Sequence, residues 1–418
     1  MKHIILGNGP CGVVAAETLR AAGPNDDILL VGNEDAPPYS RMAIPYLLEG
    51  NIDEAGTYLR KSPGHFEGLR IKQRRGLVVS VNDKKNTVLF DDGHFEHYDR
   101  LLLATGSHPV RPPIPGIDLE GVLTCWTLAD ARSIAARAAR GARVLQLGAG
   151  FIGCIIMESL VKRGVKLTVV ELGDRMVPRM MTPAAGGMIK RWVENQGVRV
   201  VTKAGVERIE KGSDAALNVT LTTGEKVDCD VVIVSAGVAP NVSFLEGTGV
   251  HVAKGVLVNR NMHSAVPNIY AAGDVAEAPD LFTGRHLVAA IQPNAADQAR
   301  VAALNMAGQA TQMSGVMAIN VLDSLGMISS SFGQWEGVAA SEGGTGVEKI
   351  DEANGRYISL QFKDDVLVGA TAIGLTSHVG ALRGLIQSKA RLGEWKEILA
   401  ETPTRFTDAY IACQRPNS

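Results

Sequence analysis

The stretch Ile4-Ile5-Leu6-Gly7-Asn8-Gly9-Pro10-Cys11-Gly12-Val13 decides the fold, because an apolar run passes through a glycine-rich turn into a helical segment. In such a G-x-G-x-x-G turn, the first glycine permits a tight bend, the second lets the backbone approach a pyrophosphate, and the third lets helix and strand pack closely. The unpaired N–H groups at the start of the helix then face the phosphates. The stretch therefore predicts a strand, a phosphate-binding turn and a helix.

The same arrangement occurs a second time in the chain. The apolar run 144–147 leads into Gly148-Ala149-Gly150-Phe151-Ile152-Gly153 and then into a helical segment. A single glycine motif is a weak signal, whereas two copies, each between an apolar strand and a helix, are much stronger. Each copy is followed by short alternating segments typical of a β-meander, and then by an apolar strand that ends in Gly106 or Gly237. We therefore predict an α/β chain with two Rossmann-like, three-layer dinucleotide-binding domains.

Domain boundaries follow from this duplication. The proline-rich stretch 109–115 suits a linker, since proline fits neither a helix interior nor a central strand. After Gly237 the chain returns to the first domain, and its tail contains a predicted hairpin followed by a helix from about Ser377 to Lys389, which indicates a small α+β domain. The predicted parts are 1–112 for the first domain, 113–235 for the second, 236–318 for the return segment and 319–418 for the C-terminal domain.

Composition and charge exclude several classes of partner. The 42 Lys and Arg residues nearly balance 44 Asp and Glu residues, so the net charge of -2 provides no electrostatic attraction for nucleic acid or an anionic membrane. The chain enters its first strand without a cleavable signal segment, and no uncharged apolar stretch is long enough to span a bilayer, so we expect a cytoplasmic protein. The five cysteines are scattered without metal-ligand spacing, so neither a metal site nor a disulfide framework is expected.

A carboxylate closes the second strand of the second copy. Glu171 comes 18 residues after Gly153, where it can accept hydrogen bonds from a ribose 2'-hydroxyl and repel a 2'-phosphate. This placement favours NADH over NADPH, and a solvated surface glutamate is the alternative. In the first copy the matching place is Gly32, and the nearest acid, Glu34, comes two residues later, so its role on a ribose is less defined.

Together these motifs resemble the FAD-dependent pyridine nucleotide oxidoreductases, the superfamily of ferredoxin and rubredoxin reductases, NADH oxidases and disulfide reductases. The resemblance covers roughly the first three quarters of the chain by motif order. It implies FAD at the first Rossmann unit and NAD(H) at the second. In that family Ala104-Thr105-Gly106 lies against FAD, and Gly273-Asp274 places a carboxylate on the ribityl and pyrophosphate portion. Asp274 could also act as a helix N-cap after the strand, which is compatible with this functional role.

The resemblance also implies roles for other residues. Gln292-Pro293 resembles the start of a helix that meets the flavin pyrimidine ring, where its dipole stabilises negative charge. Arg41 follows a Pro-Tyr-Ser loop that resembles the family's arginine loop near FAD, and Phe151 is either a gate over the nicotinamide side of the flavin or a plain core residue. No catalytic side chain is assigned, because hydride transfer takes place at the flavin itself. The implied FAD set is Gly7, Gly9, Pro10, Cys11, Gly12, Glu34, Arg41, Val78, Ala104, Thr105, Gly106, Gly273, Asp274, Gln292 and Pro293, and the implied NAD set is Gly148, Gly150, Phe151, Ile152, Gly153, Glu171 and Gly237.

Two departures from the family concern its reactive groups. Met42 stands near the place of the single redox cysteine of some branches, and a thioether cannot form the thiolate that such chemistry needs. Many relatives also pair a Lys after the first Rossmann unit with a Glu just after the second glycine motif. This chain has Ile44-Pro45 and Cys154-Ile155 in those neighbourhoods, so both charges are missing together, as expected for the loss of a whole ion pair.

The sequence thus favours an FAD-dependent NAD(H) oxidoreductase that transfers electrons between NADH and an iron-sulfur or other redox protein. Its tail resembles that of the ferredoxin-reductase and nitrite-reductase-like branch, although the aromatic pair of ferredoxin reductases is not evident around residues 320–325. The chain could act alone or as the flavin subunit of a larger oxidoreductase. The alternative is an NADH oxidase or diaphorase that reduces oxygen or quinones directly. The identity of the partner and the oligomeric state stay open.

Overall fold

The computed structural model describes residues 1–213, 215–375 and 377–414. Two compact units are formed, unit 1 from residues 1–47, 52–108 and 238–317, and unit 2 from residues 48–51, 109–237 and 318–418. The division of residues 113–235 and 319–418 into two separate domains stays a prediction. The last four residues of the predicted C-terminal domain, 415–418, lie outside the described residues. In the described residues no helix is long and apolar enough to cross a membrane.

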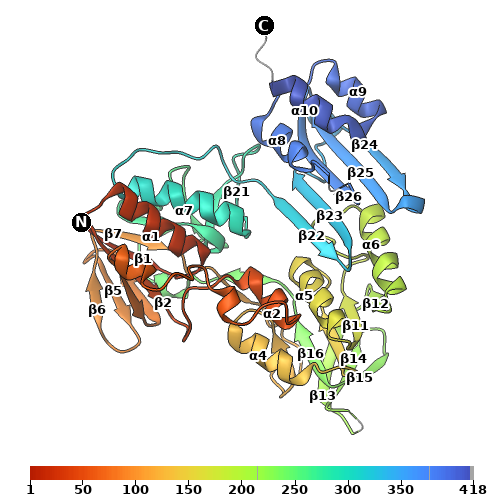
Figure 1. Ribbon diagram of the computed structural model, residues 1–418, viewed down its shortest axis with the longest axis horizontal. Helices are drawn as coiled ribbons and strands as arrows, with labels where there is room; N and C mark the ends of the chain where they lie inside the picture. Colours follow the sequence, from red (N-terminus) through yellow and green to blue (C-terminus); the bar gives the residue numbers. More distant parts are fainter. Residues whose placement is uncertain (214, 376, 415–418) are drawn as a thin grey trace. The chain divides into compact units, whose positions relative to one another are not determined.

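Unit 1 is built on a five-stranded parallel sheet in the order β19-β7-β1-β2-β3. Its central strand β1 is apolar from Ile4 to Leu6, and Ile4 and Ile5 are both fully buried, as expected where a parallel sheet is covered on both faces. Helices α1 and α7 pack together on this sheet, and the antiparallel β4-β5-β6 meander adds Val81, Val88 and Phe90 to the same core. Figure 1 shows these elements. Their bounds are β1 Lys2–Leu6, α1 Pro10–Ala22, β2 Asp27–Gly32, β3 Ile71–Arg75, β4 Val78–Asn82, β5 Thr87–Phe90, β6 Phe95–His97, β7 Arg100–Leu103, β19 Ile269–Ala271 and α7 Gln292–Met306.

Short elements complete unit 1 and its connections. A second small sheet has the order β18-β20-β21, and β8 pairs with β17. Beyond Pro109 the predicted linker carries no helix or strand until β9, in agreement with its proline content. The bounds are α2 Ile44–Leu48, α3 His65–Gly68, β8 Ser107–Pro109, β17 Val238–Pro240, β18 Val256–Leu257, β20 Ala276–Pro279 and β21 His286–Leu287.

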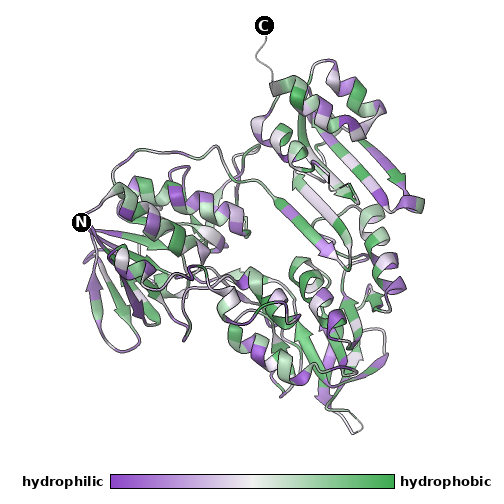
Figure 2. Ribbon diagram, in the orientation of Figure 1, coloured by the Kyte–Doolittle hydropathy of each residue, from purple (hydrophilic) through white to green (hydrophobic). Residues whose placement is uncertain are grey.

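Unit 2 repeats the first architecture. Its parallel sheet has the order β12-β11-β10-β16-β9, so β10 occupies the central place that β1 occupies in unit 1. The strand β16 is uniformly hydrophobic in Figure 2, and the β13-β14-β15 meander packs Val206, Leu217 and Leu221 against the sheet. The predicted duplication of a three-layer α/β fold is confirmed. The bounds are β9 Val122–Thr124, α4 Leu128–Arg137, β10 Arg143–Leu147, α5 Phe151–Lys162, β11 Lys166–Glu171, α6 Pro183–Asn195, β12 Arg199–Thr202, β13 Val206–Lys211, β14 Leu217–Leu221, β15 Lys226–Cys229 and β16 Val231–Val234.

The tail of unit 2 is an antiparallel sheet in the order β22-β23-β26-β25-β24 with three helices after it. The predicted hairpin corresponds to β25 and β26. The helix expected from Ser377 begins only at Gly380, because His378 adopts a left-handed backbone conformation (φ 60°) that interrupts helical geometry. The Trp192 indole on α6 donates to the Leu325 carbonyl (3.0 Å), which attaches this sheet to the rest of unit 2. The bounds are β22 Ile319–Ser324, β23 Met327–Gly333, β24 Gly344–Asp351, β25 Arg356–Lys363, β26 Val366–Ile373, α8 Gly380–Ser388, α9 Trp395–Glu401 and α10 Phe406–Gln414.

Candidate functional site

The first glycine-rich turn is shaped by packing at two of its glycines and is open at the third. Gly7 has φ +117°, and a Cβ atom there would lie 2.0 Å from the Ala104 carbonyl oxygen. A Cβ atom on Gly12 would lie 1.8 Å from the Gly7 carbonyl oxygen. A Cβ atom on Gly9 would meet nothing within 4 Å. The middle glycine therefore faces free space, which is what the approach of a pyrophosphate requires.

The second turn has the same geometry in unit 2. Cβ atoms on Gly148 and Gly153 would lie 2.5 and 2.4 Å from backbone oxygens, whereas one on Gly150 would meet nothing within 4 Å. The residues before the two helices have nearly equal angles, φ −72° and ψ −173° at Gly9 and φ −75° and ψ −170° at Gly150. Neither helix receives a side-chain cap, so its first N–H groups are directed at the space in front of the turn. Both turns fit a dinucleotide pyrophosphate.

Strand ends beside the turns supply further predicted contacts. Thr105 and Gly106 follow β7, and Gly237 follows β16. Gly106 and Gly237 both have positive φ (65° and 108°), and a Cβ atom at either would meet nothing within 4 Å. The Thr105 hydroxyl donates to the Asn241 carbonyl (2.9 Å), so it is engaged within unit 1. The structure places these residues at the carboxyl ends of parallel strands, where open α/β sheets bind ligands.

Asp274 lies next to the first turn. The Ser107 hydroxyl donates to its carboxylate (3.0 Å), and the Cys11 side chain lies beside Gly273. Ala272, not Asp274, is the N-cap residue of the short helix 273–275, so the capping alternative is wrong. Burial raises the pKa of Asp274 above its ordinary value of 3.8, although the Ser107 hydroxyl and the Arg41 charge act in the opposite direction. A ligand hydroxyl that donated a hydrogen bond to this buried carboxylate would offset part of the cost of its burial.

Replacing Asp274 with Asn should stabilise the FAD-free protein and weaken FAD binding. The pKa of Asp274 is higher in the folded protein than in the unfolded chain, so ionisation of this carboxyl destabilises the fold. The loss of stability begins as the pH rises above about 3.8, and it is complete above the pKa of the folded protein. Asn carries no charge and still accepts from Ser107, so this cost disappears, whereas a neutral amide accepts ribityl hydroxyls less strongly. Thermal unfolding of the FAD-free proteins between pH 5 and 8, with FAD titrations, measures both effects. Equal FAD affinity in the two proteins would contradict the predicted role of Asp274.

The predicted residues Glu34 and Arg41 bind each other. Arg41 donates to one oxygen of Glu34 (2.8 Å), and the Tyr39 hydroxyl donates to the other (2.7 Å). Glu34 and Asn8 both line a cavity of about 340 Å³ beyond the end of β2. This cavity adjoins the glycine turn, so its position suits the adenosine end of a dinucleotide. The sequence did not predict the pairing of Glu34 with Arg41.

The remaining predicted FAD residues lie in other parts of unit 1. Gln292 and Pro293 form the first turn of α7, and the Ser40 hydroxyl donates to the Gln292 side chain (3.0 Å), which joins this turn to the arginine loop. Val78 is the first residue of β4 and is half-buried. It does not line either of the cavities described here. Its contact with FAD stays a prediction.

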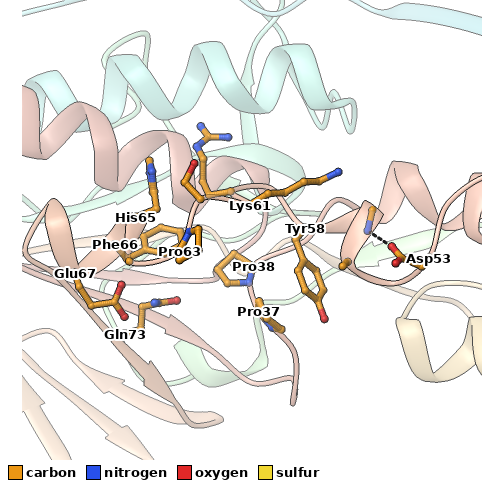
Figure 3. Close-up of a pocket in the computed structure, with 15 residues that line it drawn as sticks. Pro37, Pro38, Asp53, Tyr58, Lys61, Pro63, His65, Phe66, Glu67 and Gln73 are labelled. Atoms are coloured by element: carbon orange, nitrogen blue, oxygen red, sulfur yellow. Dashed lines mark hydrogen bonds between the residues drawn. The ribbon is translucent and has the colours of Figure 1, made fainter.

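A larger cavity of about 650 Å³ in unit 1 contains none of the predicted cofactor residues. Pro37, Pro38 and Tyr58 line it, as Figure 3 shows. Arg60 and His65, which also line it, both bind Glu17, at 2.6 and 2.8 Å. The smaller cavity and the glycine turn, where the open N–H groups are, therefore stay the predicted place of the cofactor.

Glu171 is a structural part of the second turn as well as a candidate ribose ligand. Its side chain is buried, and its two oxygens accept from the backbone N–H groups of Ala149 and Gly173, each at 2.7 Å. The alternative of a solvated surface glutamate is wrong. Hydrogen bonds to the ionised form hold the carboxylate beside the turn. The sequence motif contains no signal for these backbone contacts.

Phe151 and Ile152 begin helix α5, directly after the open Gly150. Both side chains are half-buried. Phe151 therefore lies at the mouth of the second turn, and its role as a gate stays a prediction. Neither side chain carries a polar group, so the predicted polar contacts of this site are the turn's N–H groups and Glu171.

The cysteines are poor nucleophiles in this fold. Burial raises the pKa values of Cys125, Cys154 and Cys229 to about 12, and it raises the pKa of Cys11 further. These thiols are therefore protonated at neutral pH. Met42, which was predicted to stand near the place of a redox cysteine, is 47% exposed, and its thioether cannot form a thiolate. Among the described residues, no group of three or more His, Cys, Asp or Glu side chains is placed to hold a metal ion.

Comparison with known proteins identifies the family. Residues 1–302 match the model of the pyridine nucleotide-disulphide oxidoreductases. The chain is 31% identical over 394 residues to the NADH-dependent phenylglyoxylate dehydrogenase subunit epsilon of Aromatoleum evansii, covering 94% of this chain and 92% of the relative. It is 31% identical to the ferredoxin–NAD(+) reductase component of the biphenyl dioxygenase system of Paraburkholderia xenovorans, covering 92% and 93%. A putidaredoxin reductase in covalent complex with putidaredoxin has the same fold, with a TM-score of 0.90, 22% identity and 99% coverage of both chains.

The chain belongs to the pyridine nucleotide-disulphide oxidoreductase family. It is accordingly an FAD-dependent NAD(H) oxidoreductase, as its two motifs indicated. The individual cofactor contacts named above stay predictions.

Proposed function

We propose that this protein oxidises NADH at bound FAD and passes the electrons singly to an iron-sulfur protein or subunit. The observation that carries the proposal is the pair of open glycine turns, both preceding uncapped helices, in a chain whose buried thiols are protonated. Two cofactors can bind, but no thiolate is available to relay electrons between them and a disulfide. The relatives that reduce ferredoxin and serve as a dehydrogenase subunit support this type of acceptor.

The chain's own residues would bind and orient the cofactors. Bound FAD would supply a centre that accepts a hydride from NADH and releases electrons one at a time. The N–H groups of α1 would hold the FAD pyrophosphate, and the positive end of the α7 dipole would stabilise negative charge on the flavin ring. Glu171 would hold the NADH ribose. Each NADH would reduce two one-electron acceptors and release one proton and NAD+.

A role as the flavin subunit of a larger oxidoreductase is a second form of this proposal. It is favoured by the match to a dehydrogenase subunit over 94% of this chain. The isolated chain would then reduce dyes with NADH but would need its partner subunits for a physiological reaction. Purification from the native cell under mild conditions would show whether the chain elutes alone or with an iron-sulfur partner. A cytoplasmic location stays a prediction that cell fractionation would check.

Anaerobic mixing of the FAD-loaded protein with NADH tests the proposal. Flavin absorbance near 450 nm should bleach rapidly, and a reduced iron-sulfur protein should appear when that acceptor is added. Oxygen and quinone should be much slower acceptors at equal concentration. Faster turnover with oxygen than with any iron-sulfur acceptor would favour an NADH oxidase instead. Absence of bleaching by NADH would refute the proposed function altogether.

A variant with all five cysteines replaced by Ala or Ser should keep NADH-driven electron transfer. The buried thiols are protonated, so they act by packing, and their loss should lower stability by about 1 kcal/mol or more at each buried site. A dye acceptor measures flavin reduction, and an iron-sulfur acceptor measures the second half-reaction. A folded, FAD-loaded variant whose flavin absorbance NADH bleached, but which then reduced neither acceptor, would show that a thiol is required.

A further inference from the structure

A short segment of the flavin-binding part of the chain belongs to the nucleotide-binding unit. Residues 48–51 are part of unit 2, whereas the residues on both sides, 1–47 and 52–108, are part of unit 1. We call residues Leu48–Asn51 the strap. Gly50 has φ +78°, a conformation that favours glycine, and it allows the strap to turn. The strap follows directly after the segment Arg41–Leu47, to which it is joined by a peptide bond.

Arg163 fixes the main chain of the strap. Its guanidinium donates to the Leu48 carbonyl (2.8 Å) and also to the carbonyls of Ala135 (2.7 Å) and Ala138 (3.1 Å) at the end of α4. Arg163 is the residue that follows α5. One side chain therefore holds the strap, the end of α4 and the end of α5 together.

The Glu49 side chain binds the strap to helix α5. This side chain is 6% exposed, and its carboxylate accepts hydrogen bonds from Lys162 (3.0 Å), Ser159 (3.3 Å) and Asn51 (2.8 Å). Ser159 and Lys162 lie on the last turn of α5, the helix that begins at the second glycine turn. A buried carboxylate with three donors from two segments holds those segments in one arrangement.

The charged contact of the strap joins residues far apart in the sequence. Glu49 binds Lys162, which lies 113 positions further along the chain. Lys162 also binds Glu158 (2.7 Å) within α5, and these carboxylates raise the pKa of Lys162 above its ordinary value.

We propose that Glu49 is a positioning residue that couples NAD(H) binding at the start of α5 to the order of the segment Arg41–Leu47. This inference rests on the proposed NAD(H) site at Gly150. A nucleotide bound there stabilises α5, and the strap held on α5 restricts the residues bonded to it. Arg41, at the far end of that segment, binds Glu34 beside the cavity assigned to the FAD adenosine. The coupling is reciprocal, so a fixed strap also favours nucleotide binding.

Amide hydrogen exchange tests the coupling in the FAD-loaded protein. In the parent protein, saturating NAD+ should slow exchange both in the Gly148–Gly153 turn and in residues 41–51. In Glu49→Gln, the turn should still be protected, whereas protection of residues 41–47 should be lost and the dissociation constant for NAD+ should rise about fivefold to tenfold. Ser159→Ala removes one donor and keeps both charges, so it should give a smaller change in the same direction.

Glu158→Gln is the matched control, because it removes a carboxylate partner of Lys162 without touching the strap. It should leave the exchange pattern of residues 41–47 and the affinity for NAD+ unchanged. The inference would be overturned if NAD+ protected residues 41–47 equally in Glu49→Gln and in the parent. It would also be overturned if NAD+ gave no protection of residues 41–47 in a parent protein that NADH reduces normally. A parent that binds FAD but shows no protection of Gly148–Gly153 and no bleaching by NADH would refute the proposed function as well. If Glu49→Gln did not fold, Ser159→Ala would decide the matter.

Discussion

Gly9→Val is expected to give a folded protein without bound flavin, whereas Gly150→Val is expected to give a flavin-loaded protein that NADH cannot reduce. Both glycines have negative φ and face open space, so a valine fits each backbone without strain. The added methyl groups would occupy the room that each pyrophosphate needs. Flavin content should fall from about one per chain to nearly zero in the first variant only. Absorbance spectra, followed by stopped-flow mixing with NADH, measure both results.

The neighbouring glycines provide the control for this pair. A side chain at Gly12 or Gly153 would overlap a backbone oxygen, at 1.8 and 2.4 Å from the Cβ atom. Gly12→Val and Gly153→Val should therefore lose stability or fail to fold, whereas Gly9→Val and Gly150→Val should keep the far-ultraviolet circular dichroism of the parent. If Gly9→Val kept its flavin, the cofactor would have to lie elsewhere than at the first turn.

The sequence predicts most of the architecture because the two copies combine several consistent local signals. The strands beside the turns are mostly apolar, as expected in a parallel sheet buried on both faces. Pro10 and Pro293 stand in the first turns of α1 and α7, where proline costs no hydrogen bond. The glycine spacing then predicts which residues approach the phosphates. Fold and cofactor class follow from short-range patterns of this kind.

Contacts between residues far apart in the chain could not be predicted in the same way. Glu171 accepts from Ala149, and Glu49 binds Lys162, because folding brings these segments together and no local pattern specifies the partner. The sequence indicated that a charged pair of the resembled family was missing, but it did not predict the pair of Glu49 and Lys162. Helix α8 begins after His378 because that residue adopts a left-handed backbone conformation. The residue type alone does not predict this conformation.

Glu171→Ala is expected to narrow the preference for NADH over NADPH by about tenfold or more, equivalent to about 1.4 kcal/mol. The carboxylate would accept from a ribose 2'-hydroxyl and would repel a 2'-phosphate, so its removal weakens NADH binding and relieves the repulsion of NADPH. The variant should also be less stable, because the buried Ala149 N–H loses its acceptor at a cost of about 1–3 kcal/mol. Stopped-flow rates of flavin reduction with each nucleotide, and denaturant unfolding, measure the two effects.

Glu171→Gln separates the contact with the nucleotide from the support of the turn. Its amide oxygen can accept from only one of the two N–H groups, and its NH2 group must face the other, so stability should fall as in Glu171→Ala. Glutamine has no charge to repel a 2'-phosphate, so the nucleotide preference should narrow as well. Equal rates with NADH and NADPH in the parent would contradict the role of Glu171 in selectivity. A parent preference that persisted unchanged in both variants, despite lower stability, would show that the carboxylate supports the turn and that other residues select the nucleotide.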